Sequence, residues 1–157
     1  TCQTMNGMWG YKITDLDYKS AETLVQYLVR AAGRDANLLL NIGPQPDGKL
    51  PAAAVERLKE MGEWLVRYGE SIYGTRGGDV PPHDWGVTTR KGDKLYVHIL
   101  DLQDNAIYLP LECKVVSAIC LNDGNPVKFD TVKGNGILLH VPDISGEPDR
   151  IIELVTR

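Results

Sequence analysis

The sequence lacks the features that mark a disulfide-stapled, membrane-spanning or nucleic-acid-binding chain. Its three cysteines, Cys2, Cys113 and Cys120, form neither a CxxC pair nor an even framework, so we expect small buried side chains rather than disulfide partners. No apolar stretch is long enough to span a bilayer. No basic run occurs, and the net charge of -4 comes from interspersed acidic and basic residues. We therefore expect neither nucleic acid nor a membrane as a partner.

Recognisable catalytic motifs are missing as well. The sequence has no GxSxG elbow, no Ser-His-Asp arrangement, no GxGxxG loop and no P-loop lysine. Its three histidines, His83, His98 and His140, are scattered without the spacing of metal ligands, so we expect no zinc site. The residues on their own therefore define no mechanism.

The most informative stretch that is present is the apolar run at residues 37–44, which ends in Gly43-Pro44. An apolar run without alternation predicts a strand buried on both faces. Helical patterns precede and follow it, and helix, buried strand and helix in succession are typical of a parallel α/β layer. In such layers functional residues lie at the carboxyl ends of the strands, so Gly43 and Pro44 mark the first place to look for a site.

The two flanking helices have clear start and stop signals. The first is predicted from Ser20, as N-cap, to Gly33, as the residue after its last turn. The second is predicted from Pro51, in its first turn, to Gly69. Its expected buried face, which Trp64 flanks, consists of Val55, Leu58, Met61, Leu65 and Tyr68.

The character of the chain changes after Tyr73. Residues 74–82 have the composition of a linker, and short β-rich runs separated by turns follow it. Several short strands at close spacing indicate an antiparallel β-sandwich, here at residues 95–100, 106–111, 115–121, 127–132, 137–141 and 151–155. We therefore predict two domains, residues 1–75 and 80–157. Because one buried parallel strand and two helices cannot enclose a core, we expect the first to be the end of a larger α/β domain and the chain to be a C-terminal piece.

The first seventeen residues look like a loop that contains one prominent aromatic residue. Trp9 has glycine close on both sides, so it either lies displayed in a cleft or caps the core. Asp15 and Asp17 are interpreted as solvated loop or cap residues, and Asp47 as the turn former before Gly48.

Three stretches together resemble the C-terminal portion of family 29 α-L-fucosidases. They are residues 1–11, residues 37–44 with Asp47-Gly48 after them, and residues 62–65 with 68–75. The resemblance implies the last part of a (β/α)8-like barrel, with the buried strand as its closing strand, followed by a small antiparallel β-sandwich. It also implies a secreted, periplasmic or lysosomal location, which the residues themselves do not indicate.

The resemblance further implies a retaining, exo-acting hydrolase of terminal α-L-fucosyl linkages that needs no metal or organic cofactor. An Asp nucleophile and a Glu acid/base perform the double displacement, and both are expected upstream of Thr1. The implied partners are a fucosylated glycan and the N-terminal part of the barrel. The family places an aromatic residue at the position of Trp9, against the apolar face of fucose near its 6-methyl group, and Met8 is expected to line the same wall.

The sequence is also compatible with two other functions. The β-rich part, with Trp85 as its only tryptophan, is either a non-catalytic carbohydrate-binding module or a structural brace. Tyr96, Tyr108 and Phe129 occupy strand positions that suggest packing, which favours the brace. Alternatively, the parent protein is a degenerate homologue without its catalytic carboxylates.

Overall fold

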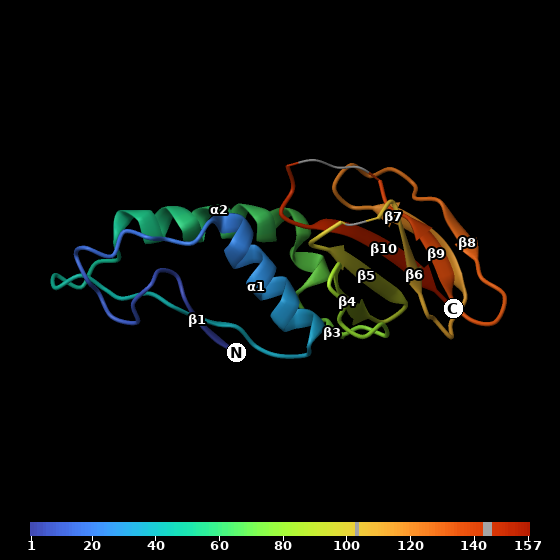
Figure 1. Ribbon diagram of the computed structural model, residues 1–157, viewed down its shortest axis with the longest axis horizontal. Helices are drawn as coiled ribbons and strands as arrows, with labels where there is room; N and C mark the ends of the chain where they lie inside the picture. The colour runs from blue at the N-terminus through green and yellow to red at the C-terminus, as the bar shows by residue number, and fades with distance from the viewer. Residues whose placement is uncertain (103, 143–145) are drawn as a thin grey trace.

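A computed structural model describes residues 1–102, 104–142 and 146–157 (Figure 1). Figure 1 shows the two helices and a short strand pair at one end and the remaining strands at the other. The chain is a small α/β structure in which most of the strand pairings are antiparallel. Its elements are β1 (Cys2–Thr4), α1 (Ala21–Gly33), β2 (Leu39–Asn41), α2 (Ala52–Tyr68), the 3-10 turn η1 (Gly69–Ser71), β3 (Arg76–Gly77), β4 (Gly86–Lys91), β5 (Lys94–Ile99), β6 (Ala106–Leu109), β7 (Val115–Cys120), β8 (Phe129–Thr131), β9 (Ile137–His140) and β10 (Arg150–Thr156).

The predicted apolar strand is present but shorter and less buried than expected. β2 pairs in parallel with β1, with Thr4 opposite Asn41, so the loop prediction is wrong for residues 2–4. Leu39 is 54% exposed, and β1 is the one neighbour of β2 among the described residues. The prediction of burial on both faces therefore fails within this chain, where β2 belongs to a sheet of only two described strands that is not covered on both faces.

Helix α1 begins as predicted and ends differently. The Ser20 hydroxyl accepts a hydrogen bond from the Thr23 N–H at 3.1 Å, which confirms the N-cap. Gly33 is the last helical residue rather than the one beyond the helix, and Asp35 adopts the positive φ of 55° instead. A Cβ on Gly33 would lie 2.4 Å from the Cβ of Val87, so glycine is needed here for close packing of α1 on β4.

Helix α2 ends at Gly69 as predicted, but its buried face is rotated from the predicted one. Pro51 is the N-cap, one residue before the helix. Trp64, expected at the flank, is only 6% exposed, whereas Leu58, expected in the core, is exposed. The reason is that the helix packs against α1 and the sheet together, and this broadens the buried stripe to include Ala54, Met61, Trp64 and Tyr68.

The remaining strands form two antiparallel sheets. One has the order β3-β4-β5-β10-β7 and the other the order β6-β9-β8. All six predicted runs contain a strand, within about two residues at most ends. The prediction missed β3, which lies inside the proposed linker, and β4, whose polar sequence hides two buried threonines, Thr88 and Thr89.

Two apolar cores lie on opposite faces of the five-stranded sheet. Leu95 and Val97 of β5 face the three-stranded sheet, while Tyr96 between them faces the helices. The packing prediction is confirmed for Tyr96 and for Phe129, which packs against the core between the sheets, but is wrong for Tyr108, which is 48% exposed.

The three cysteines, all expected to be buried, differ in their exposure. Cys120 is buried as expected, Cys113 is half-buried, and Cys2 is exposed because it lies on β1 at the margin of the molecule. Within the described residues, no helix has the length and apolar content needed to cross a membrane.

Candidate functional site

The loop that joins β1 to α1 is tied firmly to the ends of the two parallel strands. Met5 is fully buried and its N–H donates to the Asn41 carbonyl at 3.1 Å. At the other end of the loop, the Lys19 N–H donates to the Met5 carbonyl at 2.9 Å. The Lys19 ammonium donates to the carbonyls of Thr4 and Asn6, at 2.8 and 3.2 Å. These bonds close the base of the loop where β1 ends.

Trp9 and Met8 lie at the outer part of this loop, with 54% and 49% of their surfaces exposed. Trp9 is therefore no cap on the core of this chain, and its display in a cleft stays a prediction. Their backbone is held from two sides. The Met8 N–H donates to Asp15 Oδ2 at 2.7 Å, and the Trp9 carbonyl accepts a hydrogen bond from the side-chain amide of Asn41.

The end of the apolar run meets the same loop. A Cβ on Gly43 would lie 2.4 Å from the backbone nitrogen of Tyr11 and 2.6 Å from the carbonyl carbon of Gly10. Only a glycine permits this contact between the two backbones. The predicted site at Gly43 and the predicted aromatic Trp9 are therefore brought to one place, at the carboxyl ends of β1 and β2.

Sequence and structure comparisons connect this arrangement with one group of hydrolases. Residues 1–70 match the family model described as Alpha-L-fucosidase. The plasma alpha-L-fucosidase of Pongo abelii is 32% identical over 161 residues, which cover 92% of this chain and 34% of that protein. The solved structure of alpha-L-fucosidase isoenzyme 1 from Paenibacillus thiaminolyticus is 34% identical, with a TM-score of 0.86 and coverage of 99% of this chain and 39% of that one. The Thermotoga maritima alpha-fucosidase in complex with fucose is 28% identical, with a TM-score of 0.81 and coverage of 98% and 39%.

The chain matches the C-terminal portion of the family 29 α-L-fucosidases. It spans about a third of the length of the curated relatives that it matches. The fucosidase match rests on both halves of the chain, because the superpositions cover its sheets as well as its helices.

The three acidic residues that the sequence places in loops and turns have different surroundings in this fucosidase portion. Asp47 accepts a hydrogen bond from the Lys49 N–H at 3.1 Å and forms an ion pair with its ammonium at 3.3 Å, which confirms the turn former. Asp17 is exposed, as expected. Asp15 is a loop residue as expected, but it is half-buried and its carboxylate accepts from the Met8 N–H, so it is less solvated than predicted. No group of three His, Cys, Asp or Glu side chains suited to a metal occurs in the described part of the chain.

The structure adds Asn41 and Asp15 to the site, and sequence reasoning missed both. In the sequence, Asn41 is one residue of an apolar run that predicts a strand. A polar side chain inside such a run needs a hydrogen-bond partner, and this need was the available signal. Asp15 gave no signal, because its partner is a backbone N–H seven residues away.

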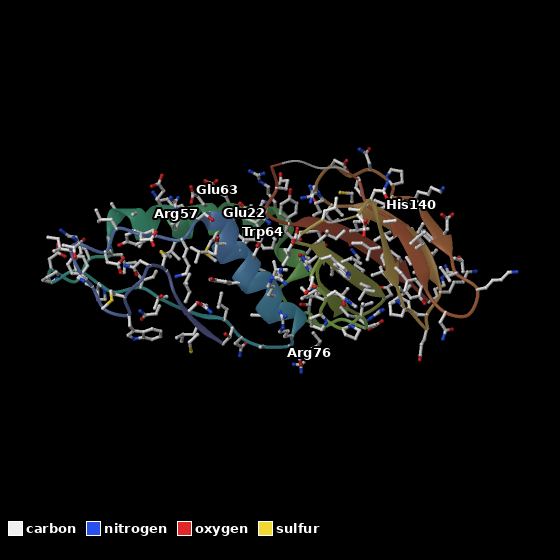
Figure 2. The ribbon with its side chains drawn as sticks, viewed as in Figure 1. Glu22, Arg57, Glu63, Trp64, Arg76 and His140 are labelled. Carbon is white, nitrogen blue, oxygen red and sulfur yellow. The ribbon has the colours of Figure 1, made fainter. Side chains whose placement is uncertain are left out.

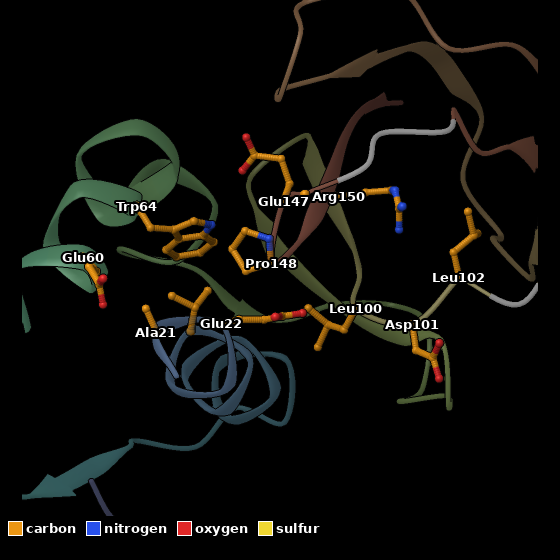
Figure 3. A pocket seen from close by; sticks show the side chains of 12 residues that line it. Ala21, Glu22, Glu60, Trp64, Leu100, Asp101, Leu102, Glu147, Pro148 and Arg150 are labelled. Carbon is orange, nitrogen blue, oxygen red and sulfur yellow. The ribbon is translucent and has the colours of Figure 1, made fainter. Parts of the chain in front are cut away.

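A hollow lies between the helices and the five-stranded sheet, apart from the Trp9 loop (Figure 3). Its volume is about 670 Å³. Figure 2 places Trp64 and Glu22 at this junction. The Trp64 indole N–H is buried and has no hydrogen-bond partner among the described residues. The lining also includes Glu60, Asp101, Glu147 and Arg150, so five of its twelve residues, with Glu22, are charged.

A buried polar network joins η1 to the sheet. His98 Nδ1 lies 2.6 Å from Asp149 Oδ2, and His98 Nε2 lies 3.1 Å from the Thr89 hydroxyl. That hydroxyl donates to the Ser71 carbonyl at 2.6 Å, so it accepts from the histidine. Burial raises the pKa of Asp149. Sequence spacing did not reveal this Thr-His-Asp chain. It is no nucleophile site, because Thr89 has no exposed surface that a substrate could reach.

Proposed function

We propose that this chain is the C-terminal portion of a retaining, exo-acting α-L-fucosidase that hydrolyses terminal α-L-fucosyl linkages of glycans. The observation that carries the proposal is the exposed Trp9 at the carboxyl ends of two parallel strands, in a chain whose relatives are α-L-fucosidases. The Thermotoga maritima relative has been solved in complex with fucose, which supports the same class of ligand here.

In this proposal the strands and helices of residues 1–75 are the last part of a (β/α)8-like barrel, and residues 80–157 are a C-terminal β-sandwich. The parallel pairing of β1 and β2, with α1 and α2 beside them, supports the first assignment. Two antiparallel sheets that share one apolar core support the second. The partner of residues 1–75 is then the N-terminal part of the barrel.

The chain's own contribution to the reaction is an apolar surface that contacts the sugar, formed by Trp9 and Met8 and called here the sugar-facing wall. Trp9 presents a flat apolar face, and Met8 extends it; together they favour a 6-methyl group over a 6-hydroxymethyl group. Stacking on such a ring contributes about 1 kcal/mol beyond the buried area. The nucleophile Asp attacks the anomeric carbon while a Glu protonates the leaving oxygen, and water then releases fucose with the Glu acting as base. Both carboxylates belong to the part upstream of Thr1, and no residue of this chain is assigned to either step.

An assay with an aryl α-L-fucoside tests the proposal. We expect turnover by the intact enzyme and none by the 157-residue chain alone, because the chain lacks both carboxylates. Turnover by the isolated chain at the intact rate would contradict the location of the carboxylates. An intact protein that contains both carboxylates and does not turn over the fucoside would overturn the proposed activity, and absence of the carboxylates themselves would identify a degenerate homologue.

A further inference from the structure

We infer that Asn41 is a positioning residue for the sugar-facing wall and sets the selectivity for a 6-methyl group by holding Trp9 in place. The inference rests on the proposed function. It connects the side-chain amide of Asn41 with the backbone carbonyl of the exposed Trp9, which precedes it by 32 residues.

Asn41 is itself held rigidly. It is the last residue of β2 and pairs with Thr4 of β1 in the parallel ladder. Its carbonyl accepts from the Met5 N–H at 3.1 Å, so the backbone at Asn41 is fixed from the β1 side. The side chain points to the loop and donates to the Trp9 carbonyl. Because a carbonyl can only accept, the amide nitrogen must be the donor in this bond.

A second bond fixes the neighbouring residue. Asp15 Oδ2 accepts from the Met8 N–H at 2.7 Å, and a carboxylate acceptor makes such a bond strong. The loop closes tightly around this carboxylate, since a Cβ on Gly7 would lie 3.3 Å from it. Met8 and Trp9 are thus anchored by two different elements: the loop itself holds the Met8 N–H, and β2 holds the Trp9 carbonyl.

These anchors matter because Trp9 is half exposed and its ring has little packing to orient it. An apolar wall discriminates a methyl from a hydroxymethyl group only when its distance from the sugar is fixed. α-L-Fucosides and α-L-galactosides differ at this one position, where the galactoside carries an additional hydroxyl. If Asn41 acts through Trp9, its removal changes the preference between these two substrates and not only the overall rate.

The first experiment measures kcat/KM of the intact enzyme for 4-nitrophenyl α-L-fucoside and α-L-galactoside. Asn41→Asp keeps the shape but turns the donor into an acceptor that faces the Trp9 carbonyl. We expect the fucoside-to-galactoside ratio to fall about tenfold, the size of effect that one methyl-sized contact supports. Asn37→Asp makes the same change at the exposed opposite end of the same apolar run, so it is the matched control and leaves the ratio unchanged. In a Trp9→Ala background, Asn41→Asp causes no further fall.

An equal loss for both substrates, or a full additional loss in the Trp9→Ala background, would overturn the inference. If the intact wild-type protein hydrolyses neither glycoside, the proposed activity is wrong, and a second measurement then decides on Asn41 alone. It uses the 157-residue chain labelled with fluorotryptophan, whose three tryptophans are Trp9, Trp64 and Trp85. We expect Asn41→Asp to move and narrow the Trp9 fluorine resonance while those of Trp64 and Trp85, which pack in the two cores, stay in place and report a folded chain. An unchanged Trp9 resonance would refute the positioning role.

Discussion

Replacing His98 by alanine removes the centre of the buried network between the helices and the sheet. In the native chain the imidazole bridges Asp149, at 2.6 Å, and the Thr89 hydroxyl, at 3.1 Å. The side chains of His98 and Asp149 have no exposed surface. Water cannot replace the lost ring without entering the core, so the variant leaves Asp149 buried without its partner.

The expected cost follows from this burial. Removing one partner of a buried pair typically costs about 3–5 kcal/mol, a value that already includes the penalty of the unpaired group. We expect a loss of about 4 kcal/mol in the free energy of unfolding, or roughly a thousandfold change in the folding equilibrium. This is a large part of the roughly 5–15 kcal/mol by which a typical domain is stable.

His140 provides a matched control. Its Nε2 lies 2.6 Å from Asp130 Oδ2, the same separation as in the buried pair, but both side chains are exposed. His140 lies on the outer sheet, away from the helices (Figure 2). The hydrogen bond from His140 lowers the pKa of Asp130, yet water can replace it. We therefore expect no resolvable loss of stability in His140→Ala.

Equilibrium unfolding in urea, followed by tryptophan fluorescence, measures both variants. The expected result is a large downward shift of the midpoint for His98→Ala, with an unchanged slope, and none for His140→Ala. Equal shifts in the two variants would show that burial does not govern the strength of these pairs. A native-like midpoint in His98→Ala would refute the assignment of the network as a structural element.

Two further predictions concern the same interface. In Asp149→Asn a carboxyl with a raised pKa is lost. Between the ordinary pKa of 3.8 and the raised value, the folded wild-type chain keeps a proton on Asp149 that the unfolded chain releases. The free energy of unfolding of the wild type therefore falls with rising pH in this window, by at most about 1.4 kcal/mol per pH unit. Urea unfolding measured across the window should show no such fall in Asp149→Asn, and the same fall in both proteins would contradict the prediction. Gly33→Ala places a Cβ 2.4 Å from the Cβ of Val87 and should cost about 1–3 kcal/mol by thermal or urea unfolding. Gly62→Ala, at an open position of α2, should stabilise the chain by up to about 1 kcal/mol, and a loss there as large as at Gly33 would refute the packing argument.

Local signals predicted the elements whose stabilising contacts are local. The sequence predicts the N-cap at Ser20 and the end of α2 at Gly69 correctly, because caps and turns depend on residues a few positions apart. The short strand β1 and the polar strand β4 were missed. Both depend on partners distant in sequence, since β1 pairs with β2 some 37 residues later and β4 is buried by α1 and η1.

The same distinction explains what could be predicted of the site. The glycines around Trp9 left display in a cleft and capping of the core open, and the exposure of Trp9 in the structure argues against the cap. The resemblance to the fucosidase family supplied its expected ligand, which the residues alone did not. Asn41 and Asp15 could not be assigned in advance, because their roles come from hydrogen bonds to backbone groups that the fold brings near.

The five-stranded sheet is the middle layer of the structure, and this explains why a histidine is buried in it. Successive residues of β5 face opposite cores, with Val97 toward the second sheet and His98 toward the helices. An antiparallel sheet with one solvated face would carry its polar side chains there. Here that face is covered by α1, α2 and η1, so a polar side chain on it must find its partners inside the protein. Asp149 and Thr89 supply them, which makes the Thr-His-Asp chain a consequence of the three-layer packing and not a second catalytic centre.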